Sequence, residues 1–301
     1  MGHILDIDGA GYFLHIRNGC FIATKDNATV LSVHPSDVAS VIFHGNQQTV
    51  SAAFLGVCAE NNIPVVFCDE KHTPASMLLP FNTHFKSAER METQINASVP
   101  IKKQIWQMIV KEKLKNQASL LLFMNHQKEA GKIFHIAELV RSGDTSNCEA
   151  QGARLYFQTL FGKEFRRGQS DIINVILDYT YTILRSCIAR EIVGAGLNPA
   201  FSIFHSNKSN AFALVDDLME PFRPLADRYA ILIYKKYDGC EELSPSIKQA
   251  CIGITKHKVL MQKQEQEFPV AIENYIYSYI SFLRKGSKNI VIPTIDYDFT
   301  L

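Results

Sequence analysis

The helical half of this chain is decided by residues Ser170–Gly194, which read SDIINVILDYTYTILRSCIAREIVG. Ser170 and Asp171 are good N-terminal caps, because their side-chain oxygens accept hydrogen bonds from the first unpaired N–H groups of a helix. The residues that follow are apolar nearly all round, whereas a surface helix carries a single apolar stripe. The stretch therefore predicts a long helix in the middle of a helical bundle.

Further helices are expected on both sides of this central one. Gly162 is a usual C-terminal stop for a helix, and Pro221 and Pro224 are expected to kink or end another. The tail, NIVIPTIDYDFTL, is expected to be extended. Helical spacing of apolar residues predicts helices over 101–116, 117–130, 148–161, 211–220, 225–237 and 245–264.

The first 80 residues have the period and turn chemistry of strands. Asn18-Gly19 supplies the positive φ values of a tight hairpin turn, between apolar runs at Tyr12–Ile16 and Cys20–Thr24. One interruption, Val50–Asn61, has helical spacing instead. Further strands are expected at 38–43, 63–68 and 75–81.

The polar stretch 81–100 ends at Pro100 and predicts a partly helical connector. The expected fold is α+β. Residues 1–80 form a β-rich, sandwich-like N-terminal domain with one helix. Residues 101–301 form a larger all-α domain that carries a metal site.

Composition excludes several classes of protein. Hydrophobic residues make up 47% of the chain, which is enough for a sizeable core. We identify no apolar run of the roughly 20 residues that span a bilayer, and the start lacks the charged-then-apolar order of a secretion signal. A soluble cytoplasmic protein is expected. The seven cysteines are scattered and contain no CxxC, which argues against a disulfide framework and a cysteine zinc site and favours reduced core residues.

Three stretches concentrate polar residues within apolar helical sequence. They are CEAQGARLYFQTLFG with Glu149, NPAFSIFHSNKSNAF with His205, and ALVDDLMEPFRPLAD with Asp217 and Glu220. Asp217 and Glu220 share one helix face, where two like charges gain little by burial unless a cation joins them. Two carboxylates and one imidazole with open positions suit Mn²⁺ or Mg²⁺, and the imidazole favours Mn²⁺.

Each of these residues also has a structural explanation. The acids at 216, 217 and 220 could form a solvated helix face. A lone histidine such as His205 is commonly a core or capping residue, and Glu149 at a helix start is favoured by the helix dipole. From the residues alone these explanations stay open.

Basic residues give a second, weaker indication, because arginines and lysines grip DNA phosphates. The net charge of +1 does not demonstrate a polyanion partner. The candidate phosphate contacts are Lys208, Arg154, Arg166 and Arg167. For Arg185 and Arg223, internal ion pairing is an equal alternative.

Taken together and in order, EAQGARLYF, GAGLNPAFSIFH and DLMEPFRPLAD resemble the CRISPR-associated spacer-acquisition endonuclease, an integrase. The segment Asn62–His72, NIPVVFCDEKH, resembles the subtype that accompanies a single-protein RNA-guided effector nuclease. The resemblance covers essentially the whole chain. It implies an N-terminal β-rich domain and a C-terminal helical domain.

The resemblance also implies a chemistry. The family's metal ligands fall on Glu149, His205 and Glu220, and a further family acid falls on Asp217, as an alternate ligand or a partner of one. The implied reaction inserts short DNA fragments into a CRISPR array by attack of a DNA 3′-hydroxyl on a phosphodiester of the repeat. The implied partners are a second copy of the chain, through the β-rich domain, and a dimer of a small ferredoxin-like protein. A contact with the effector nuclease is left open.

Two other functions are compatible with the residues. A non-catalytic DNA-binding scaffold would use the acids structurally and would bind DNA equally well in EDTA. A metal-dependent phosphohydrolase acting on small nucleotides is disfavoured, because the sequence contains no GxxxxGK[ST] loop to cradle phosphates.

Overall fold

The structure is a computed structural model that describes residues 3–44, 47–68, 74–80, 84–205, 209–237, 239–285 and 289–301. The chain divides into two compact units. Unit 1 contains Met1–Ser87 and Ala189–Leu197, and unit 2 contains Ala88–Ile188 and Asn198–Leu301. Strands followed by helices confirm the expected α+β fold. The finer division at residues 80 and 100 stays a prediction.

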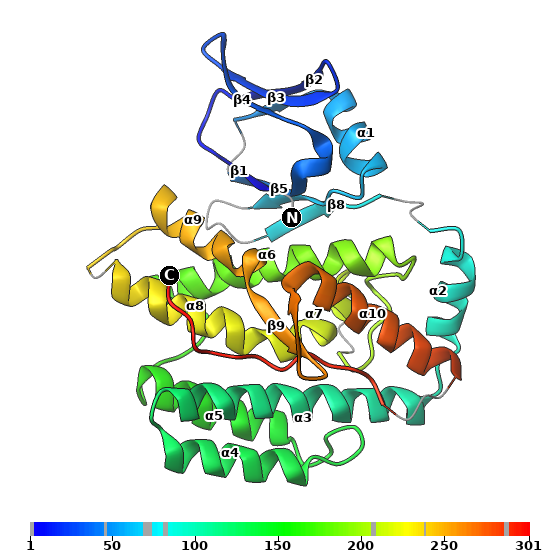
Figure 1. Cartoon of the computed structure of the whole chain (residues 1–301), viewed down its shortest axis with the longest axis vertical. Coiled ribbons are helices and arrows are strands. Elements are labelled where there is room, and N and C mark those ends of the chain that lie inside the picture. Colours follow the sequence, from blue (N-terminus) through cyan, green and yellow to red (C-terminus); the bar gives the residue numbers. More distant parts are fainter. Residues whose placement is uncertain are drawn as a thin grey trace. The chain divides into compact units, whose positions relative to one another are not determined.

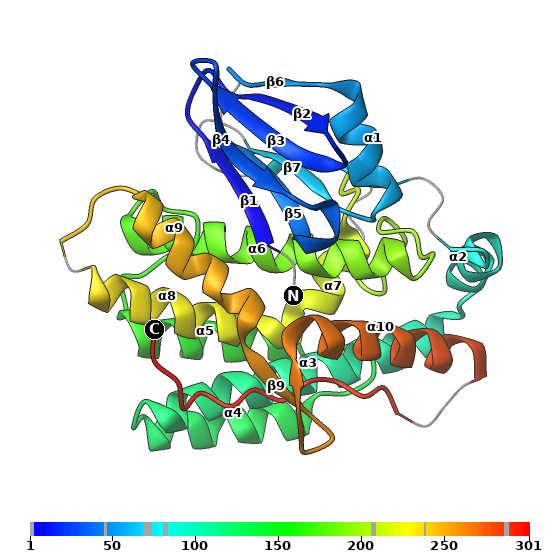
Figure 2. The ribbon, with the colours of Figure 1, turned by 45° about the horizontal axis from the view of Figure 1, so that its top comes forward.

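Unit 1 contains two four-stranded sheets and one helix, α1 (Figures 1 and 2). The first sheet has the order β1-β5-β7-β8 and the second β4-β3-β2-β6. Their bounds are β1 His3–Asp8, β2 Phe13–Arg17, β3 Cys20–Lys25, β4 Ala28–Val33, β5 Val38–His44, β6 Thr49–Val50, α1 Ala52–Glu60, β7 Val65–Cys68 and β8 Pro74–Leu78, with a 3-10 turn, η1, at Pro35–Asp37.

The core of unit 1 is shared by both sheets and by α1. Phe21 of β3, Val41 of β5 and Phe54 of α1 are all fully buried in one hydrophobic cluster. The predicted hairpin is confirmed: Arg17 of β2 pairs with Cys20 of β3, and Asn18 and Gly19 have φ values of 52° and 74°. Local turn chemistry therefore fixes the register of this sheet.

Unit 2 contains the helices from α2 onwards and one hairpin. Its bounds are α2 Ser87–Ile95, α3 Val99–Phe123, α4 Gln127–Leu139, α5 Cys148–Phe161, α6 Ile172–Gly194, α7 Ala213–Met219, η2 Glu220–Phe222, α8 Arg223–Lys236, α9 Pro245–Ile252, η3 Gly253–Lys256, β9 Lys258–Met261, β10 Gln264–Glu267 and α10 Phe268–Lys285, of which Ser87 and the last residues of α6 belong to unit 1. Helix α3 packs against α4, α5, α7, η2 and α8, which makes it the scaffold of this unit (Figure 1).

Two predicted helices differ from the structure. The expected break between residues 116 and 117 is wrong, because α3 runs unbroken for 25 residues and ends before Asn125, whose φ is 66°. The helix expected over 245–264 ends at Ile252. Beyond it, Gln262 and Lys263 adopt positive φ values and form the turn between β9 and β10. Helix α10 was not predicted at all.

Several boundaries are confirmed. Helix α5 ends at Phe161 before Gly162, whose φ is 93°, and Asp171 caps α6 by accepting a hydrogen bond from Asn174 N. The tail from residue 289 is extended apart from a bridge between Leu260 and Thr294. All seven cysteines lie among the described residues, and no disulfide joins them.

Helix α6 is long and apolar enough to cross a membrane by length and composition alone, so the view that no apolar run reaches that length was too strict. In its most apolar window, 61% of the residues are buried inside the protein. Such burial is typical of the central helix of a bundle, as the sequence predicts.

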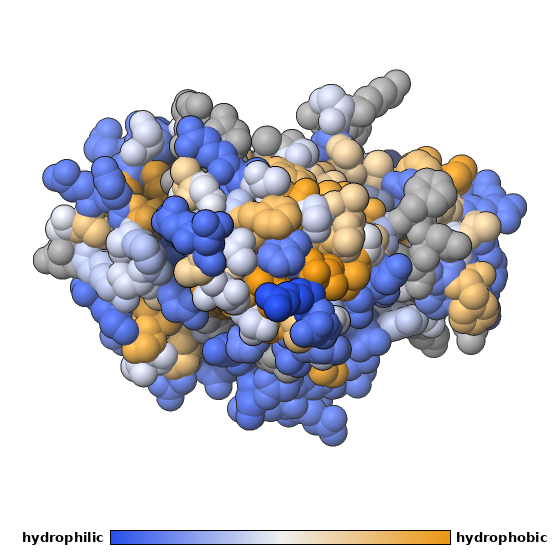
Figure 3. All heavy atoms as spheres, turned by 90° about the horizontal axis from the view of Figure 1, so that it is seen from above, coloured by the Kyte–Doolittle hydropathy of each residue, from blue (hydrophilic) through white to orange (hydrophobic). Residues whose placement is uncertain are grey.

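Hydrophobic side chains also reach the surface. Figure 3 shows one face on which hydrophobic side chains (orange) lie among polar ones (blue). In unit 1, Phe13 of β2 is 41% exposed and Val30 of β4 is 55% exposed. Both strands belong to the sheet β4-β3-β2-β6.

Asn116 of α3 ties distant segments of unit 2 together. Its fully buried side-chain amide donates to Pro221 O at 2.9 Å and to Pro293 O at 3.2 Å. Its side-chain oxygen accepts from Ile295 N at 3.4 Å, and its backbone carbonyl accepts from Tyr297 Oη at 2.8 Å. One buried amide thus fixes the segment after Glu220 and the C-terminal tail.

We expect Asn116→Leu to lower the free energy of unfolding by about 2–4 kcal/mol, because it strands buried carbonyls and an N–H that each cost about 1–3 kcal/mol when unpaired. Urea denaturation followed by circular dichroism measures this. Asn96→Leu, at an exposed position, is the matched control. A loss within about 0.5 kcal/mol of the control, the range of ordinary surface substitutions, would contradict the role of Asn116.

Candidate metal centre

Glu149 is placed by the start of α5. The buried Asp144 carboxylate accepts hydrogen bonds from Cys148 N and Glu149 N, both at 2.9 Å, and so caps the helix from outside it. Gly152 allows α5 to approach α3 closely, because a Cβ at this position would lie 2.1 Å from Leu114 Cδ2. The cap and the close approach direct the Glu149 side chain toward α3.

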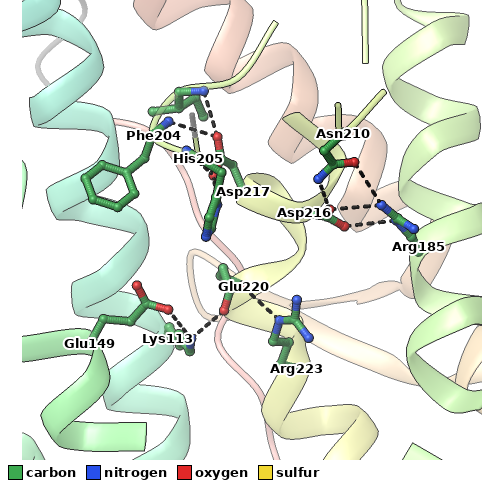
Figure 4. Close-up of polar contacts among 11 residues, drawn as sticks. Lys113, Glu149, Arg185, Phe204, His205, Asn210, Asp216, Asp217, Glu220 and Arg223 are labelled. Atoms are coloured by element: carbon green, nitrogen blue, oxygen red, sulfur yellow. Dashed lines mark hydrogen bonds and ion pairs between the residues drawn. The ribbon is translucent and has the colours of Figure 1, made fainter. Parts of the chain in front are cut away.

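His205 is held by Asp217. The fully buried Asp217 carboxylate accepts from Ile203 N at 2.7 Å, Phe204 N at 3.0 Å and His205 N at 3.4 Å. It also lies 2.5 Å from Nδ1 of the His205 ring. With Nδ1 engaged, Nε2 is left on the far side of the ring, which points toward Glu149 and Glu220 in Figure 4.

Glu220 lies where α7 passes into the 3-10 turn η2, beside Pro221. Its carboxylate is buried and bound on both oxygens: Oε1 lies 2.9 Å from Arg223 Nε, and Oε2 lies 2.5 Å from Lys113 Nζ. Burial opposes ionisation, but Arg223 and Lys113 outweigh it and hold the pKa of Glu220 at about 2. Glu220 is therefore an anion at neutral pH.

Lys113 of α3 joins the two glutamates. Its buried ammonium lies 2.7 Å from Glu149 Oε1 as well as 2.5 Å from Glu220 Oε2 (Figure 4). Burial acts to lower the pKa of Lys113, but Glu220 and Glu149 raise it above its ordinary value, so the side chain is a cation. The two carboxylates thus converge on one buried positive charge.

A second layer of residues supports Arg223. The Arg223 guanidinium lies over the Tyr181 ring, 4.8 Å from its centroid. Tyr181 Oη donates to Asp227 Oδ1, and Tyr156 Oη donates to Asp227 Oδ2 at 2.8 Å. Burial raises the pKa of Asp227 to about 6, against the lowering effect of these tyrosine hydrogen bonds. This buried network fixes the ring that carries Arg223.

Among the described residues, no three His, Cys, Asp or Glu side chains are gathered closely enough to hold a metal ion in this arrangement. In this arrangement the Lys113 ammonium lies between Glu149 and Glu220 (Figure 4). Sequence reasoning missed Lys113, although a lysine one helical turn from the apolar Ile109 and Val110 is unusual on an inward face.

The other predicted residues that the structure describes have partners of their own or lie elsewhere on their helices. Asp216 is paired with Arg185 and accepts from Asn210 at 2.7 Å, so internal pairing holds for Arg185, as it does for Arg223. Arg167 contacts Asn174 and Asp178, and Arg166 donates to the carbonyls of residues 163 and 165. Arg154 lies along α5. Lys208 lies outside the described residues.

Comparison with known proteins gives one family. Residues 5–239 match the family model described as CRISPR associated protein Cas1. A CRISPR-associated endonuclease Cas1 of Neisseria meningitidis serogroup C is 35% identical over 272 residues, which cover 90% of both chains. A second relative, from Francisella tularensis subsp. novicida, is 25% identical over 278 residues, which cover 84% of this chain and 85% of that protein.

Solved structures share the fold. A casposase bound to an integration product superposes with a TM-score of 0.84 at 17% identity, covering all of this chain and 96% of the other. A Cas6-RT-Cas1–Cas2 complex superposes with a TM-score of 0.79 at 20% identity, covering 98% of this chain and 36% of the other.

The contact with Asp217 predicts how His205 titrates in EDTA. The hydrogen bond to Asp217 raises the pKa of His205 above its ordinary value of 6.5, although burial acts in the opposite direction. The stabilisation by protonated His205 is therefore fully present below pH 6.5 and is lost as the pH rises through the folded-state pKa. We expect Asp217→Asn to lower this pKa, measured by NMR titration of the ring protons.

The exposed His135 of α4 provides an internal control, since the substitution should leave its ring signals unchanged. If His205 titrated identically in Asp217→Asn and in the wild type, the contact with Asp217 would not be the cause of its raised pKa.

Proposed function

The chain belongs to the CRISPR associated protein Cas1 family, and on that premise we propose that it is a metal-dependent DNA endonuclease and integrase. Its proposed reaction inserts short DNA fragments into a CRISPR array by attack of a DNA 3′-hydroxyl on a phosphodiester. One observation carries the site assignment: Glu149 and Glu220 converge on a single buried cation, and the His205 ring points toward them (Figure 4).

The donor set fits a divalent ion. Glu149, His205 and Glu220 are the proposed ligands, and their two carboxylates and one imidazole are a donor set that suits Mn²⁺ or Mg²⁺. Glu220 Oε2 is buried and is bound by the Lys113 ammonium at 2.5 Å. Such an oxygen retains lone pairs for a metal. When bound, the ion would supply Lewis-acid stabilisation of charge on the reacting phosphate.

The chain's own residues prepare this site. Asp217 is proposed to hold the His205 ring by Nδ1 and so leave Nε2 for the ion, which is the usual arrangement around a ligating histidine. Arg223 orients Glu220 through Oε1. Lys113 must leave the carboxylates when an ion binds, and its ammonium is then available for a DNA phosphate.

Several partners belong to the proposal. Phe13 and Val30 give unit 1 exposed apolar surface on one sheet, which supports pairing with a second copy of the chain. A relative in a solved complex with Cas2 supports a small CRISPR-associated partner dimer. Arg154, Arg166, Arg167 and Lys208 remain proposed DNA contacts. An effector-nuclease contact remains a further proposal.

Removal of a ligand tests the function. In Mn²⁺, with supercoiled DNA carrying a CRISPR array and the small partner present, we expect Glu220→Gln and His205→Ala to lose cleavage and insertion. The loss should exceed the roughly 10–100-fold that is typical when only a partner of a ligand is removed. The loss of activity in Asp217→Asn should fall within that roughly 10–100-fold range, because Asp217 is a partner of the proposed ligand His205.

Glu138→Gln and His135→Ala, both at exposed positions of α4, are the matched controls. Full activity of His205→Ala would refute the ligand assignment. DNA binding that is equal in EDTA, with no cutting under any condition, would leave a non-catalytic scaffold instead.

Lys113 gives a test that needs no DNA. We expect Lys113→Met to destabilise the protein in EDTA by about 3–5 kcal/mol, because it removes one partner from the buried ion pair with Glu220. Mn²⁺ should restore more stability to this variant than to the wild type, since the ion no longer competes with an ammonium for the same oxygens. Denaturant unfolding in EDTA and in Mn²⁺ measures both effects. If Mn²⁺ stabilised the two proteins equally, the metal ion and the Lys113 ammonium would not be competing for the same oxygens, and the proposal would be contradicted.

A further inference from the structure

Phe204 is an exposed aromatic ring beside the candidate metal centre. It immediately precedes His205, and 46% of it is exposed to solvent. The ring stacks on the fully buried Trp106, with centroids 4.4 Å apart and planes only 3° from parallel. In Figure 4 it points away from Asp217. Single exposed hydrophobic residues are ordinary on a protein surface, so the position and rigidity of this ring are what require an explanation.

Both the ring and the backbone of Phe204 are held in place. Phe204 N donates to Asp217 Oδ2 at 3.0 Å, and the preceding Ile203 is buried and bound to the same oxygen at 2.7 Å. Trp106 also meets the His205 ring edge-on, with centroids 5.4 Å apart. An aromatic ring that is already fixed loses little conformational freedom when a ligand stacks on it.

We propose that Phe204 is a stacking platform for one unpaired nucleobase of the DNA strand that reacts at the adjacent centre. This inference rests on the proposed function. Base faces stack on aromatic side chains regardless of sequence. A base inside a duplex has both faces covered by its neighbours, so the platform selects an unpaired nucleotide. The strand must therefore be open beside the reacting phosphate.

The shared hydrogen-bond acceptor supports this assignment. Asp217 binds the Phe204 backbone and the His205 ring through its two carboxylate oxygens. The platform and the proposed metal ligand therefore keep a fixed separation, with their ring centroids 5.9 Å apart. A base stacked on Phe204 would position its own strand relative to the centre without a sequence-specific contact.

The test uses DNA with 2-aminopurine at an unpaired position next to a duplex, and binding is measured in EDTA so that no chemistry occurs. We expect the wild type to quench 2-aminopurine fluorescence and Phe204→Ala to lose this quenching. Phe204→Ala should weaken binding of this DNA roughly 5- to 150-fold, the value of one base stacked on an aromatic ring. Phe204→Tyr should retain both properties, and Phe204→Leu should retain neither.

Two controls separate stacking from a general loss of binding. Phe134→Ala removes an exposed ring on α4 that is 37% exposed, and it should behave as the wild type. A fully paired duplex should bind Phe204→Ala and the wild type equally. Circular dichroism and thermal unfolding check that each variant is folded. If Phe204→Ala does not fold, the comparison of Phe204→Leu with Phe204→Tyr tests whether an aromatic ring is required.

Equal binding of the open DNA by Phe204→Leu and the wild type would overturn the platform, as would equal weakening for open and paired DNA. These outcomes are distinct from a failure of the proposed function. If the wild type neither cuts nor inserts DNA but quenches 2-aminopurine through Phe204, the platform stands and the enzyme assignment fails. If the wild type is active and Phe204→Leu binds open DNA normally, only the platform fails.

Discussion

The structure depends on the neutralisation of two glutamates that the fold brings together. Glu149 and Glu220 come from segments 71 residues apart, and each lies within 2.7 Å of the Lys113 ammonium. Two carboxylates placed so closely without a cation would repel each other in a medium that solvates charge poorly. The ammonium makes this convergence stable without a metal ion. A divalent ion binding to the same carboxylates would have to displace it.

One helix, α3, supports the region in which the two glutamates meet. Helix α3 carries Trp106, Lys113 and Asn116 on one long rigid element, so the support of Phe204, the buried ammonium and the clamp on Pro221 share one frame. An interruption after residue 116, as the sequence suggested, would separate these roles. The asparagine does not break α3 because its side chain bonds to distant carbonyls instead of to its own helix, where it would compete with backbone hydrogen bonds.

The sequence was sufficient to predict those features that depend only on residues close together in the chain. The Asn18-Gly19 turn, the Gly162 stop and the Asp171 cap act within a few residues, and each was predictable. The signals failed where packing decides. Residues 258–267 could continue a helix by spacing, yet they form a hairpin whose β9 also bridges Thr294, far along the chain. Lys113 could not be assigned for the same reason: its two partners are brought to it only by the tertiary fold.

The structural explanations for Glu149 and His205 are also partly true. The contacts that stabilise the fold at these positions are the ones that orient the two side chains. Glu149 does open a helix, and His205 is indeed a hydrogen-bonded residue in a turn. The same contacts that satisfy them structurally also orient them: the Asp144 cap directs Glu149, and Asp217 turns the His205 ring. A site that must exist before its ion arrives needs ligands with such local partners, because their entropy is then lost on folding and not on binding. Structural and functional roles at these positions are therefore one arrangement, and neither excludes the other.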